Sequence, residues 1–253
     1  MVWWLGVLNL KEDVSRSRVK VSVVLPAHNE VDALEPAVSE ITRILDEYGE
    51  TYEVVIAEDG STDGTDKKAY DLSERLHAVR HIHSDKRLGR GKALKNAFRQ
   101  SRGEILVYMD VDLATDVRQL KELISSIDEE GYDFATGSRL LPGSNVERKR
   151  TRNIASKTYN FMVRAVLGSK VKDHQCGFKA FRREPLMQLL NEIGADHWFW
   201  DTELLVRAHR KGYKIKEIPV LWRSGRETKV RLLYDSVNMG WQILALWWHL
   251  KVQ

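Results

Sequence analysis

The sequence has a single cysteine and no long apolar run, and both features narrow the kind of protein it encodes. Cys176 is the one cysteine among 253 residues, so an internal disulfide is excluded and a reducing compartment is favoured. No run reaches the roughly 20 apolar residues that span a bilayer. The apolar start, residues 1–10, lacks the basic region and small-residue cleavage site of a signal peptide. We therefore expect neither a transmembrane span nor a secretion signal.

Two common nucleotide-binding motifs are also absent. The turn at residues 26–30 lacks Gly-x-Gly-x-x-Gly, which argues against a dehydrogenase-type pyrophosphate turn. The chain contains no Gly-x-x-x-x-Gly-Lys-Ser/Thr loop. The segment at residues 89–92, Gly-Arg-Gly-Lys, offers flexible backbone and two cations near a phosphate, but it is a weak motif by itself.

Acidic residues are scarce in one segment of the chain. Residues 139–183 contain twelve Lys or Arg and two acids, so this segment carries +10. Because the whole chain carries +4, the remaining residues carry −6. Such a basic block favours an anionic partner: nucleic acid, phosphate or membrane lipid. A solvated helix face without a partner is the alternative.

The first 130 residues alternate between the patterns of strands and helices. Apolar runs predict strands at residues 19–25, 52–57, 79–83, 105–109 and 133–137, and three- and four-residue apolar spacing predicts helices at residues 31–48, 91–100 and 117–130. A further helix is predicted after the polar turn at residues 59–64, with Asp63 or Thr65 able to cap it. Strands that alternate with helices imply right-handed βαβ units. We therefore predict an α/β fold with a mainly parallel, Rossmann-like sheet flanked by helices.

The second half of the chain has a less regular pattern. It predicts helices at residues 151–167 and 200–211, strands at residues 175–181 and 213–220, a mobile basic loop at residues 223–230 and amphipathic helix at the C-terminus. Five of the eight tryptophans lie near the chain ends: Trp3, Trp4, Trp241, Trp247 and Trp248. Because Trp and basic residues mark membrane interfaces, we predict that residues 231–253 form a membrane-interface tail. A helix docked on the core, or a dimer contact, is the alternative.

Two aspartates follow the predicted strand at residues 105–109. Asp110 and Asp112 are two residues apart, so in an extended chain they point to the same side. The carboxyl end of such a strand lies at the sheet edge where α/β proteins bind ligands. Paired carboxylates favour a hard cation, Mg²⁺ or Mn²⁺, which commonly also binds substrate phosphates. A solvated turn is the alternative.

Six motifs, in this order, resemble those of family 2 inverting glycosyltransferases. They are Val-Val-Leu-Pro-Ala-His-Asn-Glu (23–30), Glu-Asp-Gly-Ser-Thr-Asp-Gly-Thr (58–65), Gly-Arg-Gly-Lys-Ala (89–93), Met-Asp-Val-Asp-Leu (109–113), Gly-Ser-Arg (137–139) and Gln-Cys-Gly-Phe-Lys-Ala-Phe (175–181). The last two are similar to those of dolichyl-phosphate mannose and glucose synthases. The resemblance covers about residues 19–230.

The resemblance implies a GT-A fold with a nucleotide-sugar half at residues 19–137 and an acceptor half at residues 138–230. It implies transfer of a hexose from UDP-glucose or GDP-mannose to a polyprenyl (dolichyl) phosphate, with Mg²⁺ or Mn²⁺ as cofactor. The protein would act peripherally at the cytoplasmic face of the membrane. Nucleic acid is not an expected partner, because a carboxylate-rich edge repels its backbone.

The resemblance also assigns roles by position in the nucleotide-sugar half. Pro26, His28 and Glu30 would line the nucleotide pocket, although His28 replaces the tyrosine usual in the family. Asp59 would hold the base or ribose. Asp110 and Asp112, in turn, would bind the cation and the diphosphate.

The third metal ligand is less certain. Mannose synthases have a glutamine two residues beyond the second aspartate, and here that position is Ala114. Thr115, Asp116 or water are the alternatives.

Four residues are assigned to the phosphates and the acceptor. Arg139 would contact a donor or acceptor phosphate, and Arg226 and Lys229 would lie in a loop that closes over the diphosphate. A polyprenyl phosphate, with a second pKa near ~6, needs no strong base, whereas a sugar hydroxyl does. Asp201 would be that base in an alternative reading, in which the acceptor is a hydroxyl of a lipid-linked or surface glycan.

Two further possibilities concern these acceptor-side carboxylates. Asp173 is a second candidate for a carboxylate near the acceptor. Asp201 has a purely structural alternative, in which it caps the helix that begins there.

Overall fold

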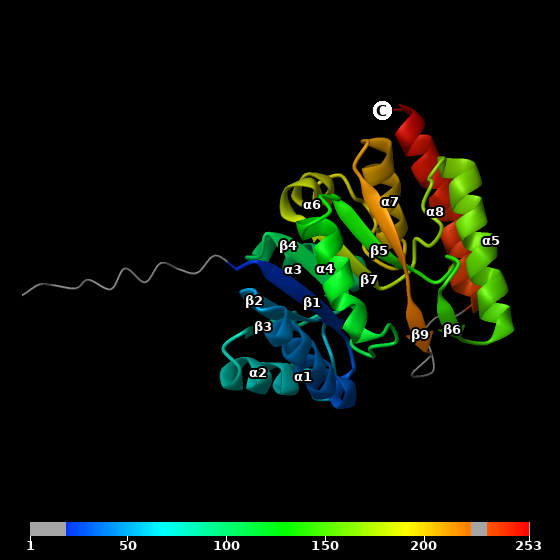
Figure 1. The fold of residues 1–253 in the computed structure, drawn as a ribbon. Coiled ribbons are helices and arrows are strands. Elements are labelled where there is room, and N and C mark those ends of the chain that lie inside the picture. The colour runs from blue at the N-terminus through cyan, green and yellow to red at the C-terminus, as the bar shows by residue number, and fades with distance from the viewer. Residues whose placement is uncertain (1–18, 224–231, 253) are drawn as a thin grey trace, which may run out of the picture.

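The computed structural model describes residues 19–223 and 232–252 and is built around one seven-stranded sheet (Figure 1). The strands lie in the order β3-β2-β1-β4-β7-β5-β8. Their bounds are β1 (Val21–Ala27), β2 (Tyr52–Glu58), β3 (Val79–Ile82), β4 (Ile105–Met109), β5 (Phe134–Ser138), β7 (Phe178–Arg182) and β8 (Ile215–Pro219). Four neighbouring pairs are parallel, and β7 runs antiparallel to both of its neighbours. The predicted mainly parallel sheet is confirmed.

The central strands are apolar because helices cover both faces of the sheet. All five residues of β4 are buried, and so are six of the seven residues of β1. Such continuous apolar runs are typical of strands buried on both faces. The helices are α1 (Val31–Tyr48), α2 (Thr65–Arg75), α3 (Arg90–Gln100), α4 (Leu120–Asp128), α5 (Arg150–Leu167), α6 (Arg183–Leu190), α7 (Trp200–Arg210) and α8 (Leu232–Val252).

Two apolar clusters divide the helices between the faces of the sheet. Side chains of α1, α2 and α4 pack on one face, and side chains of α3, α6 and α7 pack on the other. Helix α1 shows why: Leu34, Val38, Ile41 and Leu45 recur at three- and four-residue spacing, and all four are buried. The sequence predicted the bounds of this helix correctly.

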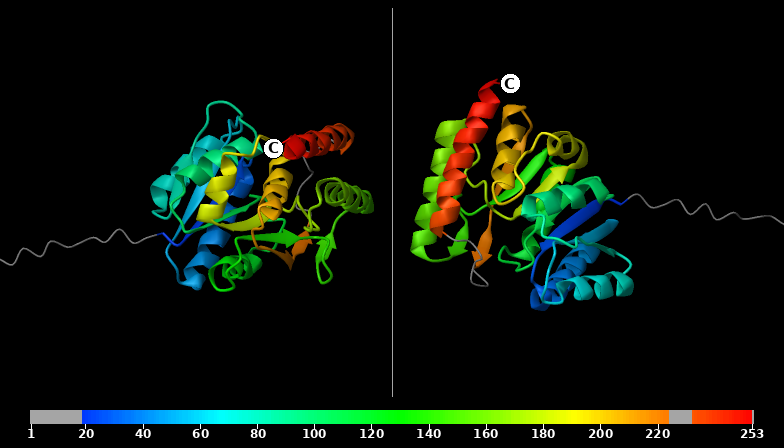
Figure 2. Two further views of the ribbon diagram at one scale, coloured as in Figure 1. Left: turned by 90° about the horizontal axis from the view of Figure 1, so that it is seen from above. Right: turned by 180° about the vertical axis from the view of Figure 1, so that it is seen from behind.

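A third cluster joins α5, α7 and α8 at one end of the molecule, where α5 and α8 lie side by side (Figure 2). Ile243 and Leu246 of α8 are buried in this cluster. The opposite face of α8 carries an exposed apolar stripe of Trp241, Leu244 and Trp248. Thus the C-terminal helix is docked on the core through one face and leaves a second apolar face open. No helix in residues 19–223 or 232–252 has both the length and the hydropathy to cross a bilayer.

The structure corrects several predicted bounds. The first strand continues through Pro26 to Ala27. Its last pair with β4 is Val24 with Tyr108, and beyond this pair the strand, including Pro26, pairs with β2 alone. The helix predicted at residues 117–130 is a short 3₁₀ helix at 117–119 followed by α4.

Three elements were not predicted. They are the short strands β6 (Asn145–Glu147) and β9 (Leu221–Arg223), which form a separate parallel pair, and α6. Of the predicted mobile loop, Arg223 belongs to β9, and residues 224–230 lie outside the described residues.

Candidate active site

The carboxyl end of the parallel strands is here called the rim. At the rim, the loops that follow β1 and β2 hold each other through reciprocal hydrogen bonds. The N–H of Asn29 donates to Ser61 Oγ at 3.0 Å, and the N–H of Thr62 donates to Asn29 Oδ1 at 2.8 Å. The N–H of Glu30 donates to Thr65 Oγ1 at 2.8 Å. Asn29 has a φ of 55°, a conformation that asparagine tolerates better than most residues. The polar residues of the first two motifs therefore fix the geometry of the rim.

Asp59 connects these two loops to a third loop, which lies between β3 and α3. One carboxylate oxygen accepts the N–H of Leu88 at 2.6 Å, and the other accepts the N–H of Gly89 at 3.0 Å. The backbone carbonyl of Asp59 accepts the Nδ1–H of His28 at 2.8 Å. Asp59 thus positions the loop that leads into α3, and its predicted contact with a base or ribose remains a prediction. So do the nucleotide contacts expected of Pro26, His28 and Glu30, which lie at the end of β1 and in the loop after it.

The paired aspartates lie at the end of β4 and meet the first residue of α3. Arg90 Nη2 is 2.6 Å from Asp110 Oδ1, and the guanidinium lies over the rings of Tyr108 and Trp198. Asp112 is exposed and has no ion pair within the described part of the chain. Desolvation by the surrounding protein and the negative charge of Asp110 raise the pKa of Asp112. Arg90 is therefore the one ion-pair partner that the described residues give these two carboxylates, and it contacts Asp110.

Gly177 explains why the sixth motif contains a glycine. Its carbonyl accepts the N–H of Asp110 at 3.2 Å, and a Cβ built on Gly177 would lie 2.0 Å from Asp110 Oδ2. Only a residue without a side chain leaves room for this carboxylate. Gly177, just before the antiparallel strand β7, thus binds the backbone of Asp110 and leaves room for its carboxylate, a role that sequence reasoning missed.

The backbone after Asp112 is strained and is held by β9. Leu113 has a φ of 48°, which is unusual for a bulky residue and typical of functional sites. The carbonyl of Ala114 accepts the N–H of Arg223 at 2.8 Å. The carboxylate of Asp116 accepts hydrogen bonds from the backbone and guanidinium of Arg118. Asp116 is therefore already engaged as a cap, which leaves Thr115 or water as the simpler source of a third metal ligand.

Arg139 forms a buried ion pair with Asp173. Its Nε lies 2.7 Å from Asp173 Oδ2 and its Nη2 lies 2.9 Å from Asp173 Oδ1, so the contact is bidentate. Burial opposes ionisation of Asp173, but the adjacent Arg139 lowers the pKa of its carboxyl well below the usual range. Asp173 thus holds Arg139 in place, and the predicted phosphate contact of Arg139 is untested.

Asp201 lies near the start of α7 and is buried with Lys179 and Tyr108. Lys179 Nζ is 2.8 Å from Asp201 Oδ1, and the hydroxyl of Tyr108 donates to the same oxygen. Burial raises the pKa of Asp201 to about 7 and lowers that of Lys179. Phe199 occupies the N-cap of α7 and no side chain caps it, so the reading of Asp201 as a helix cap is wrong.

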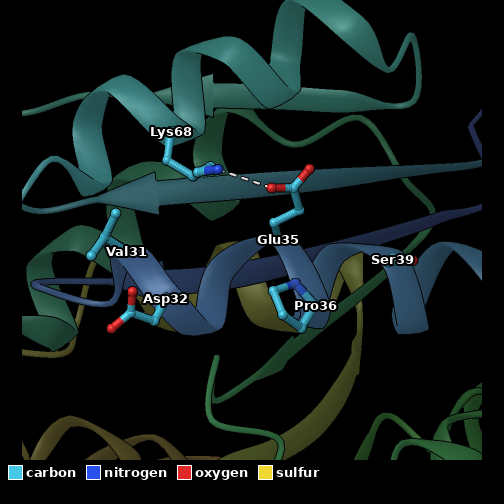
Figure 3. Close-up of a pocket in the computed structure, with 6 residues that line it drawn as sticks. All are labelled: Val31, Asp32, Glu35, Pro36, Ser39 and Lys68. Atoms are coloured by element: carbon cyan, nitrogen blue, oxygen red, sulfur yellow. Dashed lines mark hydrogen bonds and ion pairs between the residues drawn. The ribbon is translucent and has the colours of Figure 1, made fainter.

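A groove of about 580 Å³ lies between α1 and α2, apart from the predicted site residues (Figure 3). Lys68 reaches Glu35 across it at 2.9 Å. The groove contains none of the rim aspartates. Arg226 and Lys229 lie outside the described residues.

The rim residues fit a divalent cation. Asp110 and Asp112 supply carboxylate oxygens, which Mg²⁺ and Mn²⁺ prefer. Desolvation and then the negative charge of Asp110 raise the pKa of Asp112, and a bound cation relieves such repulsion between carboxylates. The described residues also contain one cluster of a different kind, Glu58, His81 and His83, in which the possible ligand atoms lie within 4.8 Å of one another.

Solved structures share this fold. Glucosyl-3-phosphoglycerate synthase from Mycobacterium tuberculosis in complex with UDP superposes with a TM-score of 0.69 at 22% identity, over 97% of this chain and 85% of that chain. The mannosyltransferase PcManGT from Pyrobaculum calidifontis in complex with GDP-Man and Mn²⁺ gives a TM-score of 0.59 at 21% identity, over 84% of this chain and 58% of that chain. The GT-A fold is thereby confirmed.

Sequence relatives are glycosyltransferases. Glycosyltransferase AglD of Haloferax volcanii is 48% identical over 237 residues, which cover 93% of this chain and 38% of AglD, so the chain spans about two fifths of that relative. The dolichyl-phosphate beta-glucosyltransferase of Homo sapiens is 30% identical over 90% of this chain and 74% of the relative. The model of glycosyl transferase family 2 matches residues 22–190. The chain therefore belongs to glycosyl transferase family 2.

Proposed function

We propose that this glycosyltransferase moves a hexose from a nucleoside-diphosphate sugar to a polyprenyl phosphate, with inversion at the anomeric carbon. The observation that carries the proposal is the state of the two buried carboxylates, Asp173 and Asp201. Each is already paired with a basic side chain, Arg139 or Lys179. A phosphate monoester is mostly ionised at neutral pH and needs no proton acceptor from the protein. A phosphate acceptor therefore suits a site whose buried carboxylates have other partners.

The rim residues would bind the donor. Asp110 and Asp112 would hold Mg²⁺ or Mn²⁺ together with the diphosphate, and the metal would supply charge neutralisation for the leaving nucleoside diphosphate. Arg90 contacts Asp110 and would keep this carboxylate oriented. Arg139, whose guanidinium Asp173 holds in place, would contact the acceptor phosphate. The basic segment at residues 139–183 would favour approach of an anionic acceptor.

We favour UDP-glucose over GDP-mannose as the donor. The names of several relatives, from yeast to human, are dolichyl-phosphate beta-glucosyltransferase. A structural neighbour was solved with UDP, and another was solved with GDP-Man and Mn²⁺. The relatives named dolichyl-phosphate beta-glucosyltransferase share more sequence with this chain than the mannosyltransferase does, which supports glucose as the transferred sugar.

The second apolar face of α8 supports contact with a membrane surface. Trp241 is 71% exposed and Trp248 is 66% exposed, and together with Leu244 they recur at the spacing of one helix face. On the neighbouring helix α5, Phe161 is also exposed. Exposed aromatic residues beside basic ones are typical of interfacial helices. We place this contact on the cytoplasmic face, where a reduced Cys176 is expected.

Transfer of labelled sugar tests the proposed reaction. The purified protein is incubated with Mg²⁺, polyprenyl phosphate and either UDP-[³H]glucose or GDP-[³H]mannose, and lipid is then extracted. We expect label from UDP-glucose in an acid-labile lipid, and none when the matching polyprenol replaces the phosphate. Label that appears with the polyprenol, or no label in the lipid from either nucleotide sugar, would contradict the proposal.

Vesicle flotation tests the membrane contact. The double variant Trp241→Ser, Trp248→Ser should lose binding to vesicles of anionic phospholipid, because most of the apolar stripe is removed. Tyr70→Ser is the matched control, since Tyr70 is 57% exposed on α2 and should not affect binding. Equal flotation of the double variant and the control would refute the interfacial role of α8.

One observation favours a second candidate function, transfer to a sugar hydroxyl. Burial raises the pKa of Asp201 to about 7, which is near the value that suits a general base at neutral pH. In this reading the chain would extend a lipid-linked or surface glycan. The assay with polyprenyl phosphate separates the two functions, because a hydroxyl-specific enzyme would not label that lipid.

A further inference from the structure

The edge strand β3 contains His81 and is followed directly by His83, and the proposed reaction uses neither histidine. His81 and His83 are two residues apart, so they share one face of the extended chain. In the parallel pair of β2 with β3, Ile56 lies opposite His81 and Ala57 lies opposite Ile82. The same register places Glu58, the last residue of β2, next to His83. The sheet therefore brings two imidazoles and one carboxylate together at its edge.

The three side chains have the geometry of a metal-ligand set. One possible ligand atom from each lies within 4.8 Å of the other two. The side chain of Glu58 is fully buried, and its Oε2 is 2.6 Å from His83 Nδ1. Its Oε1 accepts the N–H of Ser61 at 2.5 Å, which fixes the orientation of the carboxylate. The Nε2 atom of His81 is buried and has no hydrogen-bond partner among the described residues.

A second carboxylate orients the exposed histidine. Asp85 Oδ1 lies 3.2 Å from His83 Nε2, so this nitrogen can donate its hydrogen to Asp85 while Nδ1 faces Glu58. Metal-binding histidines usually donate their other N–H to a carboxylate or carbonyl in this way. The side chain of His83 is 45% exposed, which leaves a path for an ion and a position for water.

We propose that Glu58, His81 and His83 bind a transition-metal ion such as Zn²⁺, at a site separate from Asp110 and Asp112. Imidazole nitrogens suit Zn²⁺, whereas Mg²⁺ prefers oxygen ligands alone. On binding, the ion replaces the proton that His83 Nδ1 shares with Glu58, and this proton goes to solvent. The inference does not depend on the acceptor or the donor of the proposed transfer reaction.

The position of the site indicates a structural effect on the rim. Glu58 directly precedes Asp59, and Ser61, which binds Glu58 through its N–H, also binds Asn29 through its Oγ. An ion held by Glu58 would therefore stiffen the two loops that hold each other at the rim. We expect the ion to raise the melting temperature without entering the transfer step.

Zinc titration of the metal-free protein in excess Mg²⁺ tests the site, because Mg²⁺ occupies the all-oxygen rim. We expect one Zn²⁺ per chain and a higher Tm. His81→Gln and His83→Gln should each weaken Zn²⁺ binding by more than about tenfold, because loss of a residue that only orients a metal ligand already costs about that much. His77→Gln is the matched control, because His77 is an exposed histidine just before β3 and should bind Zn²⁺ as the wild type does.

A further variant guards against effects of misfolding. The side chain of Asp85 is 96% exposed, so Asp85→Asn should keep the fold and still weaken Zn²⁺ binding by roughly 10–100-fold. The visible spectrum of bound Co²⁺ gives an independent readout and should change in His81→Gln. Unchanged Zn²⁺ affinity in both His81→Gln and His83→Gln would overturn the proposal. Loss of this Zn²⁺ in Asp112→Asn instead would also overturn it, by placing the ion at the rim.

Discussion

Two carboxylate pairs in this protein differ in how their charge is balanced. Asp110 and Asp112 lie at the rim, where the described residues supply one ion pair, between Arg90 and Asp110. Asp173 and Asp201 lie in the second half of the chain, and each is paired with its own basic side chain, Arg139 or Lys179. The first pair retains negative charge that a ligand can neutralise. The charge of the second pair is already balanced inside the protein.

This contrast separates residues kept for a ligand from residues kept for the fold. A buried carboxylate without a partner is costly, so Asp173 and Asp201 depend on their cations. A partly exposed pair of like charges destabilises the fold slightly and gains most from an added cation. We therefore expect substitutions in the first pair to affect activity, and substitutions in the second pair to affect stability.

The largest expected effect is on activity, at the rim. Asp110→Asn and Asp112→Asn should each reduce transfer by roughly 10³-fold or more, because metal-assisted charge stabilisation contributes several kcal/mol. For Asp112→Asn, which breaks no ion pair among the described residues, the free energy of unfolding should stay within about 0.5 kcal/mol of the wild type. A raised folded-state pKa means that the ionised Asp112 costs stability above that pKa, so Asp112→Asn should be neutral or slightly stabilising. Initial rates and thermal melts measure both quantities. Full activity in both variants after chelation of the metal would break the contrast.

The second effect is on stability and concerns the ion pair of Asp173 with Arg139. Asp173→Asn should lower the free energy of unfolding by about 3–5 kcal/mol, because Arg139 remains buried without its counter-charge. The double variant Asp173→Leu, Arg139→Met should recover much of that loss, since removing both charges removes the unpaired one. Urea denaturation of the three proteins measures the difference. A single variant as stable as the wild type would contradict the structural role of Asp173.

A smaller effect concerns pH and the buried His174. Its Nδ1–H donates to Asn160 Oδ1 at 2.8 Å, its Nε2 accepts from Ser169 at 2.9 Å, and burial lowers its pKa to about 3. A lowered folded-state pKa gives stability that is present above the unfolded pKa of ~6.5 and lost as the pH falls toward the folded value. Between pH 7 and 5 this group should therefore remove about 2 kcal/mol of stability.

Comparison with His174→Gln isolates that contribution, since the other titrating groups are common to both proteins. Urea denaturation at pH 7 and pH 5 gives the two differences in the free energy of unfolding. The variant should lose about 2 kcal/mol less than the wild type over this range. Equal losses in the two proteins would show that His174 does not titrate as its burial requires.

The sequence predicted best the elements whose pattern is local. The bounds of α1 and β4 matched the structure, because helical spacing and a continuous apolar run are visible within a short window. The strands β6 and β9 have three residues each and pair across more than 70 positions of sequence. Such short strands carry no periodicity of their own, so their pairing could not be predicted.

The candidate site shows the same division. The position of Asp110 and Asp112 at the end of a buried strand was predictable from the sequence alone. The partners of Asp201 were not, because Lys179 and Tyr108 come from β7 and β4 and meet it only in the folded protein. The two-residue spacing of His81 and His83 was visible in the sequence, but Glu58 comes next to them only through the register of the sheet.

The pH dependence of transfer by Asp201→Asn tests the central claim most directly, because the claim is that the acceptor phosphate needs no protein base. We expect kcat/KM for polyprenyl phosphate to fall by less than about tenfold in the variant, below the 10²–10⁴-fold contribution typical of a general base. The acid limb should lie near the second phosphate pKa of ~6 in both proteins. Circular dichroism and thermal melts confirm that the variant is folded. Two results together would contradict the claim. The folded variant would lose 10³-fold or more in kcat/KM, and the wild type would show an acid limb near the Asp201 pKa of about 7 that disappears on substitution.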